Sequence, residues 1–390
     1  WFLRGLALHW DEPEVAIVCY RKASDLRAAE HLFYPQAVLH LARARNQQLY
    51  ARRELEPLPE AVNSLKQLVD YGGYRAYPCY LLSISHRLAA EIYHGSDGTR
   101  GDDALVSKNY AAALDWARKG QELEPQNDRP IAAEAECLES LGQYDEAIAA
   151  RTRALAVADA DVRRWEQYHY RWRLYYWTGQ YEAALGDLEQ LVGFAPQDRF
   201  YRHVYPALVQ AERGDLSAAT EHAHAIVAEA PSSAQAVIWA ATLLRLLGQA
   251  DAAENLLASR ADSVDFTIGL MAPQTAEWAR ALYAACRGAG TFAELDALAQ
   301  AAAAPRKLWG ESQFHRGARL LAAGDREGAG EHILKAYRSF DSEQRYTYHA
   351  NILRVRMQKD VAGPPWIGIS SGSESRGPRE GETSRAAAGT

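Results

Sequence analysis

Apolar residues recur along most of the chain at offsets of three, four and seven positions, which is the spacing of an amphipathic helix. Ile131, Ala135 and Leu138 form one such stripe, and a second stripe begins at Ala147. Gly142 lies between them, where a glycine tolerates the left-handed backbone that ends a helix. The pattern therefore predicts pairs of helices joined by short turns.

The turn and the start of the following helix recur as a degenerate motif. Residues 141–148 read LGQYDEAI and residues 178–185 read TGQYEAAL, with looser copies at 213–219, 247–253 and 323–329. The glycines at positions 142, 179, 214 and 248 are 37, 35 and 34 residues apart, a period that indicates stacked helical repeats. A small residue that allows two helices to approach closely stands five positions after each motif glycine: Ala147, Ala184, Ala219, Ala253 and Ala329.

Prolines that cannot continue a helix close several of the second helices, at Pro125, Pro196 and Pro231. Together these features resemble the tetratricopeptide repeat, a helix–turn–helix unit of about 34 residues. The resemblance covers roughly residues 1–340 and is degenerate at 30–105 and 260–305. It implies an all-α fold, a right-handed superhelical solenoid of antiparallel helix pairs with about eight repeats.

The clarity of the repeat divides the chain into four parts. We expect degenerate repeats at 1–127 with an inserted loop at 95–104, regular repeats at 128–260, and degenerate repeats with a capping helix (Tyr346–Lys359) at 261–360. Residues 361–390 are rich in Gly, Ser, Glu and Arg, a composition that predicts a disordered tail. Because the chain begins at Trp1 inside a recognisable repeat helix, we expect it to be a fragment of a longer protein.

Composition narrows the classes of partner. The 43 Lys and Arg residues are interspersed with 50 Asp and Glu residues, and the net charge of −7 argues against a nucleic-acid binder. The four cysteines, at positions 19, 79, 137 and 286, are too far apart to indicate disulfides or a zinc site, which favours a cytoplasmic location. No run approaches the roughly 18–20 apolar residues of a membrane span.

Catalytic motifs are missing from the sequence. It contains neither a phosphate-binding loop nor a metalloprotease HExxH motif, and Ser85–Leu88 lacks the Asp of a kinase catalytic loop. His222 and His224 are two positions apart on a predicted helix, so they point away from each other and do not form a metal site. We therefore expect no enzymatic activity, no cofactor and no metal.

One aromatic segment marks a candidate binding surface. Residues 165–177 hold seven aromatic residues and two arginines, the residue types that dominate binding hot spots. The resemblance implies that first-helix positions 2, 5, 9, 12 and 13 line a concave groove, and counting back from Gly179 gives the candidates. They are Glu166, His169, Arg173, Tyr176 and Trp177, with Tyr201 and Gln235 at position 2 of the next two repeats. We expect these side chains to be exposed, and Tyr168, Trp172 and Tyr175 to form the core.

The sequence thus favours a protein-interaction scaffold that binds a peptide or helix of a protein partner in its groove. The six asparagines fall outside the groove positions that can be assigned, which argues against the carboxylate clamp of chaperone-binding repeat domains. The alternative is the C-terminal sensor or docking region of a bacterial serine/threonine kinase, whose repeats are similar in style. A catalytic domain in the upstream sequence would distinguish the two. The sequence does not indicate an oligomeric state.

Overall fold

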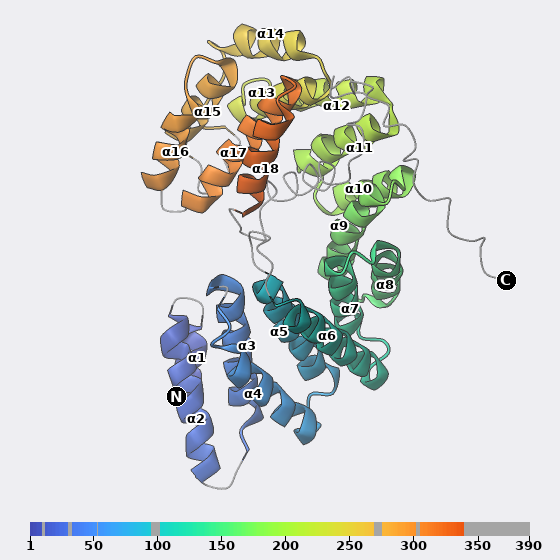
Figure 1. The fold of residues 1–390 in the computed structure, drawn as a ribbon, viewed down its shortest axis with the longest axis vertical. Helices are drawn as coiled ribbons and strands as arrows, with labels where there is room; N and C mark the ends of the chain where they lie inside the picture. The colour runs from blue at the N-terminus through green and yellow to red at the C-terminus, as the bar shows by residue number, and fades with distance from the viewer. Residues whose placement is uncertain are drawn as a thin grey trace, which may run out of the picture. The chain divides into compact units, whose positions relative to one another are not determined.

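The computed structural model describes residues 1–9, 12–29, 33–52, 54–94, 102–268, 275–301 and 305–338. Within these ranges the chain forms eighteen α-helices, one short π-helical segment (η1) and no strand. Most consecutive helices pack side by side, as Figure 1 shows for the labelled elements, and short turns join the helices that a motif glycine separates. The prediction of an all-α array of helix pairs is confirmed.

The chain divides into two units, Trp1–Val209 and Gln210–Thr390, which are described separately. Unit 1 contains α1 (Phe2–Leu8), α2 (Pro13–Ala29), α3 (Pro35–Arg52), α4 (Leu58–Tyr71), α5 (Ala76–His94), α6 (Asp103–Leu123), α7 (Asp128–Ser140), α8 (Tyr144–Val157), α9 (Asp161–Trp177), α10 (Tyr181–Phe194) and η1 (Phe200–Val204). The boundary falls within α11 (Tyr205–Arg213). Unit 2 contains α12 (Leu216–Glu229), α13 (Ala234–Leu246), α14 (Ala250–Arg260), α15 (Ala276–Arg287), α16 (Phe292–Ala301), α17 (Pro305–Ala322) and α18 (Arg326–Arg338). The division of the chain into four parts by the regularity of the repeat motif stays a prediction.

The motif glycines end the first helix of a pair. Gly179 has φ of 80°, a left-handed conformation that L-residues with a side chain rarely adopt, and Gly142, Gly214, Gly248 and Gly324 share this conformation. At Gly142 the chain reverses through hydrogen bonds from Gly142 N to Glu139 O and from Gln143 N to Leu138 O. The alanines five positions after the glycines are completely buried: Ala147, Ala184, Ala219, Ala253 and Ala329. Small side chains at these positions bring the helices into contact.

The insertion between α5 and α6 ends earlier than the sequence indicated. Residues 103 and 104 lie in the first turn of α6 rather than in the loop, because the Asp102 side chain accepts hydrogen bonds from Ala104 N (3.0 Å) and Leu105 N (3.1 Å). Residues 95–101 of that loop lie outside the described residues. So do the predicted capping helix at Tyr346–Lys359 and the predicted tail at 361–390.

The π-helical segment η1 has a local cause. Pro206, at the second position of α11, has no N–H to bond with the carbonyl of Arg202. The chain widens just before it, and Tyr205 N bonds to Phe200 O, one residue further back than in an α-helix. The widened turn contains Tyr201, whose hydroxyl meets His169 of α9 at 2.8 Å.

In unit 2 every residue of α13 is buried. Helix α17 covers part of it, because the Trp239 ring packs against Phe314 and His315 with centroid distances of 5.5 and 5.0 Å. A polar contact of 3.1 Å joins Thr242 Oγ1 to His315 Nδ1 in the same contact. None of the helices in the described ranges has both the length and the hydropathy needed to cross a membrane.

Candidate functional site

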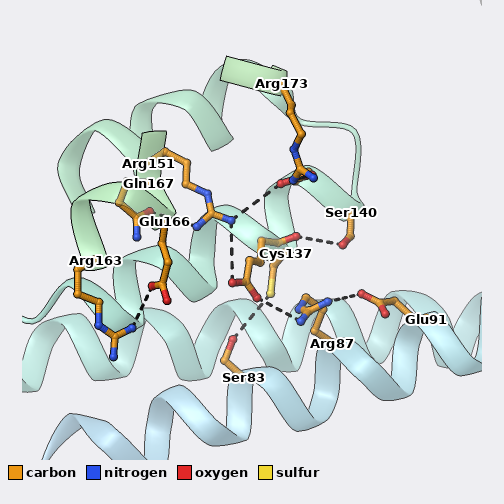
Figure 2. A network of polar contacts seen from close by, with 12 residues as sticks. Ser83, Arg87, Glu91, Cys137, Ser140, Arg151, Arg163, Glu166, Gln167 and Arg173 are labelled. Carbon is orange, nitrogen blue, oxygen red and sulfur yellow. Dashed lines mark hydrogen bonds and ion pairs between the residues drawn. The ribbon is translucent and has the colours of Figure 1, made fainter. Parts of the chain in front are cut away.

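The candidate site lies on three successive first helices of unit 1. Helix α5 packs against α7, and α7 contacts α9, so side chains from all three helices meet. We call the surface that they share the first-helix face. Figure 2 shows its polar side chains, which come from α5, α7 and α9 together with Arg151 of α8.

The structure buries most of the residues predicted to line the groove. His169, Arg173, Tyr176, Trp177, Tyr201 and Gln235 are each 5–8% exposed, and only Glu166 is partly exposed. The expectation that these side chains are exposed is therefore wrong for six of the seven. Their role in binding a partner stays a prediction.

Aromatic packing explains this burial. The Trp165 ring stacks on His169 at 4.7 Å, and the His169 Nδ1 atom contacts the Tyr201 hydroxyl. Trp177 and Tyr176 pack against Tyr144 and Tyr181, the aromatic residues that begin α8 and α10. The neighbouring turns thus cover side chains that a single helix would leave in solvent.

The expected core assignments are only partly confirmed. Trp172 is 1% exposed, as expected, but Tyr168 and Tyr175 are partly exposed. Both rings lie against the Arg171 guanidinium, with its carbon 5.6 and 5.4 Å from the ring centroids. Arg171 in turn forms a bidentate pair with Asp187 of α10 at 2.7 and 2.8 Å. This side of α9 therefore holds α10 through an ion pair flanked by tyrosines.

A network of arginines and glutamates joins the helices of the first-helix face. Arg87 of α5 contacts Glu136 of α7 at 3.1 Å. Arg173 of α9 donates a hydrogen bond to Glu139 of α7 at 3.2 Å. Arg151 of α8 lies 3.9 Å from both of these carboxylates (Figure 2). Three cations thus share two glutamates on α7.

The network is layered by depth. The side chain of Arg151 is 1% exposed and that of Arg173 is 6% exposed, whereas Glu136 and Glu139 are 27% and 20% exposed. The ring of Tyr170 receives both guanidinium groups, at 4.4 Å from Arg151 and 4.8 Å from Arg173. Arg151 and Arg173 lie beneath the carboxylates, and Arg87, at 20%, is as exposed as Glu139.

This packing shifts the pKa values of two side chains on α5. Burial by itself would lower the pKa of Arg87, but the carboxylates of Glu91 and Glu136 raise that pKa above the ordinary arginine value. Burial raises the pKa of Tyr80 on α5, and the nearby carboxylates of Glu136 and Glu166 raise it further. Arg87 therefore stays charged and Tyr80 stays neutral at ordinary pH.

A second group of charges lies at the N-terminal ends of α7 and α9. Arg163 donates a hydrogen bond to Glu166 at 3.1 Å, and its Nε lies 4.0 Å from Asp128 Oδ2. Asp128 is 8% exposed, and its Oδ2 atom is buried without a hydrogen-bond partner. The Glu166 side chain is 37% exposed.

The repeat register also points to the two glutamates of α7, although the sequence prediction counted groove positions only from Gly179. Counting back from Gly142 in the register used for Gly179 places Glu136 and Glu139 at the positions that Arg173 and Tyr176 occupy on α9. Arg87 and Arg151 had no such signal. Arg87 lies on α5, which no motif glycine follows, and Arg151 lies on α8, the second helix of its pair. Only the fold brings these two side chains to the glutamates.

The site consists of carboxylates, guanidinium groups and aromatic rings in contact with one another. Within the described ranges, no group of three His, Cys, Asp or Glu side chains is placed to hold a metal ion. The network offers carboxylate acceptors and aromatic rings fixed by surrounding helices. Such groups recognise a partner through hydrogen bonds, ion pairs and ring contacts.

Comparisons with known proteins address the fold. No family model matches the chain, and no curated protein matches it. Among solved structures, the chain is similar to a thermophilic TPR (tetratricopeptide repeat) protein of Thermus thermophilus, with 20% identity, a TM-score of 0.41, and coverage of 53% of this chain and 96% of that one. It is also similar to a tetratricopeptide repeat protein from Parabacteroides merdae, with 13% identity, a TM-score of 0.42, and coverage of 80% and 98%.

The assignment of the fold rests on the chain itself. Its helices form successive pairs, left-handed glycines end the first helices, and completely buried alanines follow at a constant offset. These are the features that the sequence shares with the tetratricopeptide repeat. The described part of the protein is an all-helical array of helix pairs, with turns and packing positions like those of the tetratricopeptide repeat.

Proposed function

We propose that this protein is an interaction scaffold that binds a segment of a partner protein across the first-helix face of α5, α7 and α9. The observation that carries the proposal is the convergence of partly exposed charged and aromatic side chains from three successive repeats on one surface. A peptide or helix lying across the repeats meets groups from each of them, which is how a stacked-repeat protein presents an extended binding surface.

The groups on this face suit recognition. Glu136, Glu139 and Glu166 are held by arginines, so a partner binds to side chains that are already ordered and loses little additional conformational entropy. Tyr80 and Tyr170, which lie near these charges, and Trp165 on α9 are partly exposed. Aromatic rings next to fixed charges are the usual composition of a binding hot spot.

Helix α13, the first helix of unit 2 that carries a predicted groove residue, does not offer the same surface. All of α13 is buried, including Gln235, and the contacts of Trp239 and Thr242 with α17 occupy part of that helix. The position of Gln235 in the repeat register would place it in a groove, but its amide atoms are buried. The proposal therefore assigns the binding surface to unit 1.

A site-specific crosslink tests the proposal. A photo-crosslinking amino acid is introduced at Glu166 on the first-helix face and, as a matched control, at Ala149, which is exposed on the second helix α8. We expect light to join the protein at position 166 to a discrete partner in cell extract, identified by mass spectrometry, with no such product from position 149. Equal products from both positions, or none from 166, would contradict the proposal.

The kinase-linked alternative stays a prediction, because it depends on sequence upstream of this chain. It is compatible with the same binding face, since a docking region also needs a surface for a partner. The crosslinked partner and the upstream sequence are separate tests of the two ideas.

A further inference from the structure

We infer that the segment bound at the first-helix face is cationic and presents Lys or Arg side chains to its glutamates. This inference rests on the proposed function and adds the chemistry of the partner. Three observations lead to it: the exposed fractions of the charged side chains, the carboxylate of Asp128, and the aromatic rings on the same face.

The depth order decides which charge a partner meets first. The guanidinium groups of Arg151 and Arg173 are 1% and 6% exposed, and the carboxylates above them keep 20–27% of their surface. The Glu166 side chain is the most exposed of the glutamates, at 37%. Arg87 and Arg163 are 20% and 24% exposed, and each is less exposed than the glutamate it contacts, Glu136 at 27% or Glu166 at 37%. In these pairs the carboxylate is therefore the partner that offers more of its surface to a bound segment.

The carboxylate of Asp128 supplies a second, independent observation. Its Oδ2 atom is buried and accepts no hydrogen bond, and the Arg163 Nε atom lies 4.0 Å away, beyond hydrogen-bond distance. Arg163 instead donates to Glu166. One guanidinium group thus serves two carboxylates, those of Asp128 and Glu166, which leaves a net negative charge among these three side chains.

The aromatic rings add a preference for cations. Guanidinium groups of this chain already lie on neighbouring rings, with Arg129 5.1 Å from the centroid of Tyr77 and Arg151 4.4 Å from that of Tyr170. The negative face of an aromatic ring attracts a cation and repels a carboxylate. Tyr80 is partly exposed, and the carboxylates of Glu136 and Glu166 are close enough to raise its pKa, so a Lys or Arg side chain meets a ring and a carboxylate together.

Fluorescence anisotropy with peptides of defined charge tests the inference. Three labelled twelve-residue probes share a Gly/Ser background and carry Lys and Arg, Glu and Asp, or Gln. We expect the basic probe to bind at least about tenfold more tightly than the others, equivalent to about 1.4 kcal/mol. Its affinity falls with added salt, since partly exposed charges are screened.

Two charge reversals separate this face from the general negative charge of the chain. Glu166→Lys lies on the face, and Glu146→Lys changes the net charge equally at an exposed position of α8. We expect a loss of about tenfold in basic-probe affinity for Glu166→Lys and less than about threefold for Glu146→Lys. Glu166→Gln, which does not place a lysine beside Arg163, gives an intermediate loss.

Equal losses in the two reversals, or binding of the acidic or neutral probe as tight as that of the basic one, would overturn the inference. Far-UV circular dichroism of each variant confirms that the helices are intact. A crosslink from position 166 to a partner segment without Lys or Arg would leave the proposed function standing and reject its cationic partner. No crosslink at all would reject the proposed function itself.

Discussion

At the scale of single residues, the burial of a charged side chain decides how much it contributes to stability. Arg151 and Arg153 lie two positions apart on α8, and both approach glutamates of α7. The Arg151 side chain is 1% exposed and that of Arg153 is 53% exposed. Water competes for the Arg153 pair with Glu134, whereas the Arg151 charge depends on the protein around it.

This difference predicts unequal costs of truncation. Arg151→Ala should lower the free energy of unfolding by about 3 kcal/mol, because it leaves Glu136 and Glu139 without a shared cation and opens a cavity beside Tyr170. Arg153→Ala should cost less than about 1 kcal/mol. Urea denaturation followed by circular dichroism measures both. Similar values for the two variants would show that Arg151 is solvated.

A histidine cluster in the first repeats predicts a dependence on pH. His40 of α3 stacks on Tyr20 at 5.5 Å and lies 6.1 Å from the His9 ring. Burial first, then the charge of Arg43, lowers the pKa of His40 from 6.5 to about 4. Between these two values the unfolded imidazole binds a proton that the folded one does not. Stability therefore falls as the pH decreases through this window.

We expect the region of α1–α3 to lose about 1–2 kcal/mol of local stability between pH 7 and pH 4, a value reduced for the partial exposure of the ring. Amide hydrogen exchange at α3 measures this loss. His40→Phe should flatten the pH dependence, and His224→Phe, at an exposed position of α12, should leave it unchanged. A steep dependence that persists in His40→Phe would assign the effect to other groups.

At the scale of elements, two glycines of one helix pair have opposite roles. Gly179 precedes α10 in the left-handed conformation, with φ of 80°, and Gly186 lies inside α10. A Cβ atom at either position meets nothing within 4 Å, so steric overlap does not distinguish them. Only the backbone conformation does.

Alanine substitutions should therefore change stability in opposite directions. Gly179→Ala forces an L-residue into left-handed backbone and should destabilise the protein by about 1 kcal/mol. Gly186→Ala removes a flexible residue from a helix interior and should stabilise it by about 0.5–1 kcal/mol. Thermal melting of both variants decides the matter, and a change of the same sign in both would refute this reading of the turn.

At the scale of the whole molecule, each helix pair packs mainly on its neighbours, so the effects of a substitution should fade along the array. We expect Arg151→Ala to reduce the hydrogen-exchange protection of α7 and α9, which it joins, while α13 and α17 in unit 2 keep theirs. Hydrogen exchange with mass spectrometry resolves these helices. Equal loss of protection in all four would mean that the chain unfolds as one cooperative block.

The candidate site shows where prediction from the sequence stopped. The register from Gly179 led to α9, and the same count from Gly142 leads to Glu136 and Glu139. The register did not predict that these side chains are buried, because the exposure of a given repeat position depends on the size of the neighbouring side chains. Trp165, Tyr181 and Tyr144 cover His169, Tyr176 and Trp177, and no helical period encodes that.

By itself the sequence determined the helices, the turns between them and the repeat register. These features are local: the apolar period of a helix, a left-handed glycine at position 142 or 179, and the alanine five positions later all act within one repeat. Tertiary structure alone decided that Arg87, Arg151 and Arg173 from three helices share the glutamates of α7. It also decided that Arg151 and Arg173 lie below the carboxylates. Charge pairing and burial depend on which surfaces the packed helices bring together, and that is a property of the stack.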